Sequence, residues 1–180
     1  MKSLKTYFVS FFILTMTAAG QQATADEIDP FIGKYMGETH DVQNDREVKR
    51  DLSVEISKRK NGFRIEWKTT KLKSSGKTST KEYSIEFDAT ERDHIYSSAM
   101  KANLFGGRQP LDPMKGDPYV WAKIEGKVIT VHAMIIAEDG GYEMLSYKRS
   151  LVKSGLNLDF TRVKNGVPQR KIMAHLDRVE

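Results

Sequence analysis

Hydrophobic and polar residues alternate along most of the chain after Asp51, most clearly on either side of Asn61-Gly62. The apolar positions of this passage are Leu52, Val54, Ile56, Phe63, Ile65 and Trp67. An alternation with a period of two predicts strands, and Asn-Gly between two such strands predicts a hairpin with a two-residue turn. That turn would set Ile56 opposite Trp67 and keep the apolar side chains on one face.

The same alternation continues to the C-terminus. It predicts further strands within 82–88, 94–100, 119–151 and 155–179, with turns near Glu91-Arg92, at Glu125-Gly126 and at Asp139-Gly140-Gly141. For the last hairpin we expect a three-residue loop with Gly166 at a bulge. This loop sets Phe160 opposite Ile172 and Leu156 opposite Leu176, so that the apolar side chains share a face.

These segments predict an all-β protein of about nine or ten strands, and no amphipathic helix is evident. Sequential hairpins produce an antiparallel up-and-down meander, which leaves two exposed edges unless it closes. We therefore expect the meander to close into a β-barrel of about 8–10 strands. A two-sheet sandwich with a filled core is the alternative.

Residues 1–25 have the features of a secretory signal peptide. Lys2 and Lys5 precede an apolar run from Tyr7 to Met16, and Ala23-Thr24-Ala25 is a small-x-small cleavage site. The run is shorter than the ~20 residues of a membrane span, and no later segment is long and apolar enough for one. We expect cleavage after Ala25, a single domain over 26–180, and a periplasmic or secreted location. The chain has no cysteine, which excludes disulfides and thiol chemistry.

Positive charge is concentrated in one part of the chain. Twelve Lys or Arg residues lie between Arg46 and Lys81, against four Asp or Glu. This imbalance is typical either of a surface that attracts anions or of a solvated lysine-rich hairpin. No nucleic-acid-binding motif accompanies it, so we expect no nucleic-acid partner.

Gly33-x-Tyr35 lies on the first predicted strand, ahead of the meander. A Gly-x-aromatic in that place resembles the calycin superfamily, which contains the lipocalins and the fatty-acid-binding proteins. The resemblance implies that the aromatic side chain fills the closed end of the barrel beneath a basic residue from a late strand. Arg178 is the candidate for that residue. Tyr stands here where lipocalins have Trp, and the short helices of fatty-acid-binding proteins are not evident.

The strands around Glu125-Gly126 have two apolar faces. The turn would set Val120 opposite Val131 on a small aliphatic face, and the other face is aromatic. The pattern leaves open which face lines the interior. If the aromatic face does, the ligand-binding candidates are Tyr119, Trp121, His132, Met134 and Tyr147, together with Trp67 from the first hairpin. If it does not, a second subunit or the segment Lys101–Pro118 must cover it, and that segment is also a candidate lid.

We expect an exported carrier or sensor that binds a small hydrophobic or amphipathic ligand, without a cofactor. Lys58 and Lys60, on the face of Ile56, are candidates to neutralise an anionic head group. One alternative is a non-catalytic interaction module with a filled core, and a homodimer is its natural form. Another is a barrel isomerase or cyclase that uses His132, Tyr147 and Arg149. Histidine spacing indicates no metal site.

Overall fold

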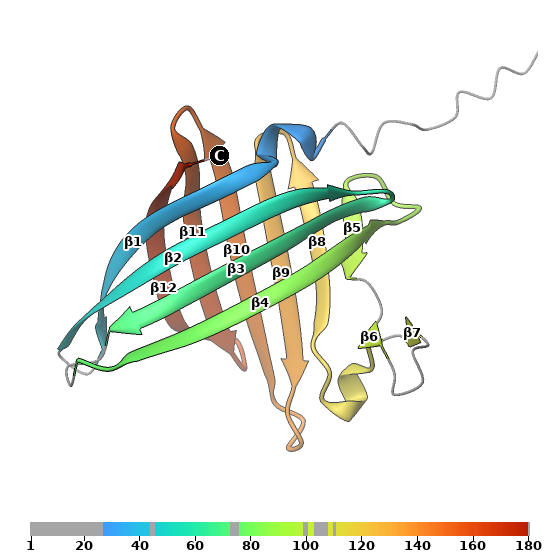
Figure 1. The fold of residues 1–180 in the computed structure, drawn as a ribbon. Coiled ribbons are helices and arrows are strands. Elements are labelled where there is room, and N and C mark those ends of the chain that lie inside the picture. Colours follow the sequence, from blue (N-terminus) through green and yellow to red (C-terminus); the bar gives the residue numbers. More distant parts are fainter. Residues whose placement is uncertain are drawn as a thin grey trace, which may run out of the picture.

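The computed structural model describes residues 27–43, 46–72, 76–98, 101–102, 108–109 and 111–179. The predicted signal peptide lies outside these residues, and so do residues 103–107 and 110 of the candidate lid. Ten antiparallel strands form a closed barrel in the order β1-β12-β11-β10-β9-β8-β5-β4-β3-β2 (Figure 1). The prediction of an all-β meander that closes into a barrel is therefore confirmed.

The barrel strands are β1 (Gly33–Gln43), β2 (Arg46–Arg59), β3 (Gly62–Leu72), β4 (Thr78–Ala89), β5 (Ile95–Ser98), β8 (Tyr119–Glu125), β9 (Val128–Ile136), β10 (Tyr142–Val152), β11 (Gly155–Lys164) and β12 (Val167–Arg178). The strands β6 (Lys101–Ala102) and β7 (Arg108–Gln109) form a separate two-stranded sheet. The short helices are η1 (Asp29–Phe31) and η2 (Pro113–Lys115).

Two predicted turns are displaced by one residue. The β2–β3 turn is Lys60-Asn61, so Trp67 pairs with Val54 and not with Ile56. Gly62 instead begins β3, where a Cβ would lie 2.0 Å from the carbonyl oxygen of Phe87. The β8–β9 turn is Gly126-Lys127, so Val120 pairs with Ala133 rather than Val131. A displacement of one residue moves each pair by two positions, so every side chain keeps its predicted face.

The predicted register of the last hairpin is confirmed. Phe160 pairs with Ile172, and Leu156 pairs with Leu176. The loop differs from the expected one, because Asn165 and Gly166 form a two-residue turn with φ values of 48° and 79°. The bulge lies further into the strands, at Arg162/Val163. A two-residue turn with both φ values positive matches the twist of a hairpin, and the bulge then restores the apolar face.

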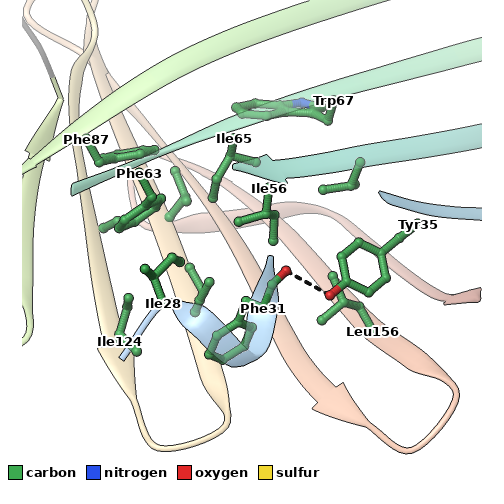
Figure 2. Close-up of a cluster of buried hydrophobic side chains, with 14 of the residues drawn as sticks. Ile28, Phe31, Tyr35, Ile56, Phe63, Ile65, Trp67, Phe87, Ile124 and Leu156 are labelled. Carbon is green, nitrogen blue, oxygen red and sulfur yellow. Dashed lines mark hydrogen bonds between the residues drawn. The ribbon is translucent and has the colours of Figure 1, made fainter. Parts of the chain in front are cut away.

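One end of the barrel is filled by a hydrophobic core. The core takes its side chains from inward positions of most strands and from the chain before β1 (Figure 2). Phe31 of η1 is fully buried, and so are Phe63 and Phe87, whose ring centroids are 5.0 Å apart. The segment Ile28–Phe31 thus closes this end of the barrel from within.

Tyr35 and Arg178 meet at this closed end. They are cross-strand partners on β1 and β12, and Tyr35 is fully buried. The Arg178 guanidinium lies 5.1 Å above the Tyr35 ring and donates hydrogen bonds to the Tyr35 hydroxyl and to the Pro30 carbonyl oxygen, each at 2.7 Å. The Tyr35 hydroxyl donates to the carbonyl oxygen of Phe31 at 2.8 Å. The pair therefore ties η1 to the strands that close the barrel.

Tyr35→Phe is expected to lower the free energy of unfolding by about 1–2 kcal/mol, because the buried Phe31 carbonyl loses its donor and Arg178 loses an acceptor. Urea denaturation of the variant and the wild type measures the difference. Tyr142→Phe is the control, since that tyrosine is 42% exposed. Equal stability of Tyr35→Phe and wild type would contradict a structural role for this hydroxyl.

Candidate functional site

The half of the barrel away from the closed end contains a cavity of about 580 Å³. Residues of β2–β4 and of β9–β12 line it: Arg50, Leu52, Ser53, Val54, Trp67, Lys68, Thr69, Lys71, Ser79, Lys81, Tyr83, Ile135, Glu143, Leu145, Tyr147, Arg149, Leu158, Phe160, Arg162, Arg170 and Ile172. A cavity of this volume is of the size that takes a small organic molecule. The cavity reaches β4 and β9, the two strands that flank the short strand β5 and its neighbour β8.

Arg149 lies at the inner end of this cavity. Its position on β10 is opposite Leu158 and Ile129, and only 1% of its surface is exposed. Its Nε and Nη1 atoms are buried without a hydrogen-bond partner. Burial lowers the pKa of Arg149 to about 10, and the opposing influence comes from Tyr147. A cationic side chain in an apolar interior normally has a carboxylate partner, so this guanidinium is a costly feature.

Aromatic rings surround the Arg149 guanidinium. It lies 5.3 Å from the centre of the Trp67 ring and 5.5 Å from that of Tyr147. Trp67 stacks on Tyr83 with centroids 5.2 Å apart, and Tyr147 packs on Phe160 at 4.7 Å. Burial raises the pKa of Tyr147, so its phenol stays protonated at neutral pH. Cation–π contacts offset part of the cost of burying the charge without neutralising it.

Further cations line the cavity nearer its outer end. They are Arg50, Lys68, Lys71, Lys81, Arg162 and Arg170. Glu143 is the one carboxylate among the described lining residues, and it accepts two hydrogen bonds from Arg162, at 2.7 and 3.0 Å. The described walls of the cavity are thus strongly positive, which favours an anion inside.

The aromatic face of β8 and β9 lies outside the barrel, and the small aliphatic face lines the interior. Val120, Ala122 and Val131 are buried, whereas half of the Tyr119 surface is exposed. On the outer face, Trp121 stacks on His132 at 4.9 Å. The predicted ligand-binding residues Tyr119, Trp121, His132 and Met134 therefore do not line this cavity. Trp67 and Tyr147 do.

The two candidate lysines lie away from the cavity. Lys58 forms an ion pair of 2.7 Å with Asp29 beside the closed end, and Lys60 is in the adjoining β2–β3 turn. The N-terminal segment closes the barrel at the end where these lysines would have met a ligand. Gly33, the third member of the predicted barrel-floor motif with Tyr35 and Arg178, begins β1 and pairs with Ile56.

His132 and Tyr147 do not converge, as the isomerase alternative requires. His132 Nδ1 lies 2.9 Å from Ser146 Oγ on the outer surface, while Tyr147, the next residue of β10, points inward. Burial and the charge of Lys123 lower the pKa of His132. Among the described residues, His, Asp and Glu side chains form no group of three that is able to hold a metal ion.

A comparison with protein-family models found none that matches this chain, and a search of curated proteins found no match either.

The part of the chain that the structure describes contains no helix with the length and hydrophobicity to cross a membrane.

Sequence reasoning did not gather the cavity cations into one site. The alternation of residues along each strand contained a signal for them. On β10, Arg149 falls at every second position together with the inward residues Leu145, Tyr147 and Leu151. A charged residue among inward-facing apolar residues indicates an unusual environment. Arg162 of β11 has the same property relative to Leu158 and Phe160.

Proposed function

We propose that this protein is an exported carrier or sensor that binds a small amphipathic molecule, with an acidic group held by Arg149. The observation that carries the proposal is the buried guanidinium at the inner end of a cavity, with two nitrogens that lack a hydrogen-bond partner. A carboxylate is the planar anion whose two oxygens match the donors of a guanidinium.

The apolar part of the ligand would lie among the rings and aliphatic side chains above Arg149. Trp67, Tyr83 and Phe160 supply flat apolar walls. The closed end beneath Arg149 is packed with buried hydrophobic residues, so the ligand would enter from the outer end. A partly hollow barrel supports a carrier over an interaction module with a filled core.

We also propose that the barrel is calycin-like. The arrangement of Tyr35 beneath Arg178 at the closed end supports this, because the resemblance implies an aromatic and a basic residue in those roles. The ten-stranded antiparallel meander is consistent with it at the level of architecture.

Fluorescence titration tests the proposed binding. Trp67 and Trp121 are the two tryptophans of the chain. Trp67 lines the cavity and Trp121 lies on the outer face, so Trp121→Phe leaves a reporter inside the cavity. We expect decanoate to change the Trp67 emission at concentrations at which decanol, its neutral analogue, has little effect.

Arg149→Met in the same background should abolish this preference. Removing one partner of a buried charge pair costs about 2–5 kcal/mol, so the affinity for decanoate should fall by a factor of at least about 30. Decanol binding should change little. If decanoate and decanol bind equally well, or if neither changes the emission of Trp67, Arg149 is not an acid-binding residue.

A further inference from the structure

Two aromatic rings from opposite walls meet inside the barrel. Strands β3 and β10 are separated by β9, β8, β5 and β4 on one side and by β11, β12, β1 and β2 on the other. Trp67 of β3 and Tyr147 of β10 nevertheless contact each other, with ring centroids 5.3 Å apart. Tyr83 of β4 stacks on Trp67, and Phe160 of β11 packs against Tyr147. The four rings therefore form a row that crosses the barrel.

The contact between the two central rings lies over Arg149. The guanidinium carbon is 5.3 Å from the centroid of Trp67 and 5.5 Å from that of Tyr147, so these three points form a nearly equilateral triangle. Tyr147 is two residues from Arg149 along β10, nearer to the outer end of the cavity. Arg149 is only 1% exposed, although it borders the cavity. An acidic group thus reaches the guanidinium only if the side chains over it move.

The space between these rings is too narrow for the chain of a ligand. Carbon atoms in contact lie ~3.5–4.0 Å apart, so a chain that passes between two rings needs ~7–8 Å between them. The observed separation is 5.3 Å, and the rings must therefore move apart by roughly 2 Å when an acid binds. Trp67 and Tyr147 both border the cavity, which gives each ring space to turn. A carbon with two methyl groups would force them further apart and disturb their packing.

We propose that Trp67 and Tyr147 form a constriction that selects acids by their width next to the acidic group. This inference rests on the proposed function, because it takes Arg149 as the residue that binds the acid. A methylene group or a planar group beside the carboxylate passes between the rings, whereas a fully substituted carbon is rejected. Beyond the constriction the cavity of about 580 Å³ accommodates bulk, so branching far from the carboxylate is tolerated.

The test compares two isomers, 2,2-dimethyldecanoate and 9,9-dimethyldecanoate, with decanoate as the reference. The isomers have the same charge and the same number of apolar atoms, so hydrophobic burial alone would give them similar affinities. Binding is measured by isothermal titration calorimetry. We expect the 2,2-isomer to bind at least about tenfold more weakly than the 9,9-isomer. Equal affinities, or tighter binding of the 2,2-isomer, would overturn the constriction and leave the proposed function intact. If none of the three acids binds, both proposals fail.

Removing the Tyr147 ring should remove the selection. In Tyr147→Ala the affinity ratio of the two isomers is expected to fall below about threefold. The ratio is the informative quantity, because a general loss of packing around Arg149 would weaken both isomers alike. Tyr142→Ala is the matched control, since Tyr142 is on the same strand but is 42% exposed, and it should keep the wild-type ratio.

Circular dichroism checks that each variant is folded. If alanine at position 147 prevents folding, Tyr147→Leu takes its place, because leucine keeps more of the apolar volume and still removes the ring. A folded Tyr147 variant with the wild-type ratio would overturn the constriction. An equal fall of the ratio in Tyr142→Ala would also overturn it, because the selection would then not arise where the two rings meet.

Discussion

Replacing Arg149 with methionine is expected to make the protein more stable while it removes the affinity for carboxylates. The guanidinium is buried, its pKa is lowered to about 10, and two of its nitrogens have no partner. A shift of this size below the ordinary value of a guanidinium corresponds to roughly 3 kcal/mol of unfavourable burial at neutral pH. Methionine keeps much of the apolar volume and removes the charge, so the free energy of unfolding should rise by about 1–3 kcal/mol.

The sign of the pH effect follows from the same shift. The folded state loses the Arg149 proton as the pH passes its lowered pKa of about 10, whereas the unfolded state keeps the proton to a higher pH. The unfolded state therefore binds more protons in this window, and the Arg149 contribution to stability rises with pH there. At neutral pH both states carry the charge and the full cost is present.

Urea denaturation at pH 7 measures the effect, with Arg59→Met as the control. Arg59 is also partly buried, but it forms ion pairs of 2.9 Å with both Glu86 and Asp88. Its removal deprives Asp88 of this ion pair and Glu86 of one of its two arginine partners, Arg59 and Arg64, and should destabilise the protein. If Arg149→Met lowers stability as Arg59→Met does, then Arg149 stabilises the fold, and its burial does not indicate a ligand-binding role.

Much of the fold followed from local patterning. The alternation in Leu52–Ile56 and Phe63–Trp67 predicted the strands and the face of each side chain. Both predictions were correct, although the turn was placed one residue away from its observed position. The β2–β3 turn was displaced for a long-range reason, since Gly62 is needed where β3 approaches the carbonyl oxygen of Phe87 on β4. The residues of the β2–β3 hairpin alone give no information about this contact with β4.

The candidate site was less accessible to sequence reasoning. Alternation places Trp121 and Val120 on opposite faces, but both faces of these strands are apolar, so the choice of the inner face depends on the closure of the whole barrel. Arg50, Arg149 and Arg170 lie on three strands far apart in sequence. Their gathering in one cavity follows from the strand order and the barrel register, which no single hairpin specifies.

Trp67→Ala and Phe63→Ala are expected to have opposite effects on stability and on ligand affinity. Both residues are on the inward face of β3, four positions apart. Phe63 is fully buried and packs against Phe87 and Tyr96, each with ring centroids 5.0 Å away. Phe63→Ala leaves a void in a closed core, so we expect a loss of about 3–5 kcal/mol in the free energy of unfolding.

Trp67→Ala should cost less stability, about 1–2 kcal/mol, although the indole is larger. One side of Trp67 already borders the cavity, so its removal enlarges an existing space instead of creating one. It also uncovers the Arg149 guanidinium, 5.3 Å from the ring, and water then relieves part of that buried charge. Ligand affinity should fall at least tenfold, because the ring forms an apolar wall of the cavity and helps to hold Arg149 in place.

Urea denaturation and calorimetric titration with decanoate separate the two effects, since calorimetry needs no tryptophan reporter. We expect Phe63→Ala, studied at a temperature where it remains folded, to bind decanoate with an affinity within about threefold of that of the wild type. Residue 63 lies in the closed core, and its replacement leaves Arg149 unchanged. Trp67→Ala should show the reverse, with a stable fold and weak binding. If Trp67→Ala loses as much stability as Phe63→Ala and keeps its affinity for decanoate, then Trp67 belongs to the structural core. In that case the Trp67 ring has no role in ligand binding.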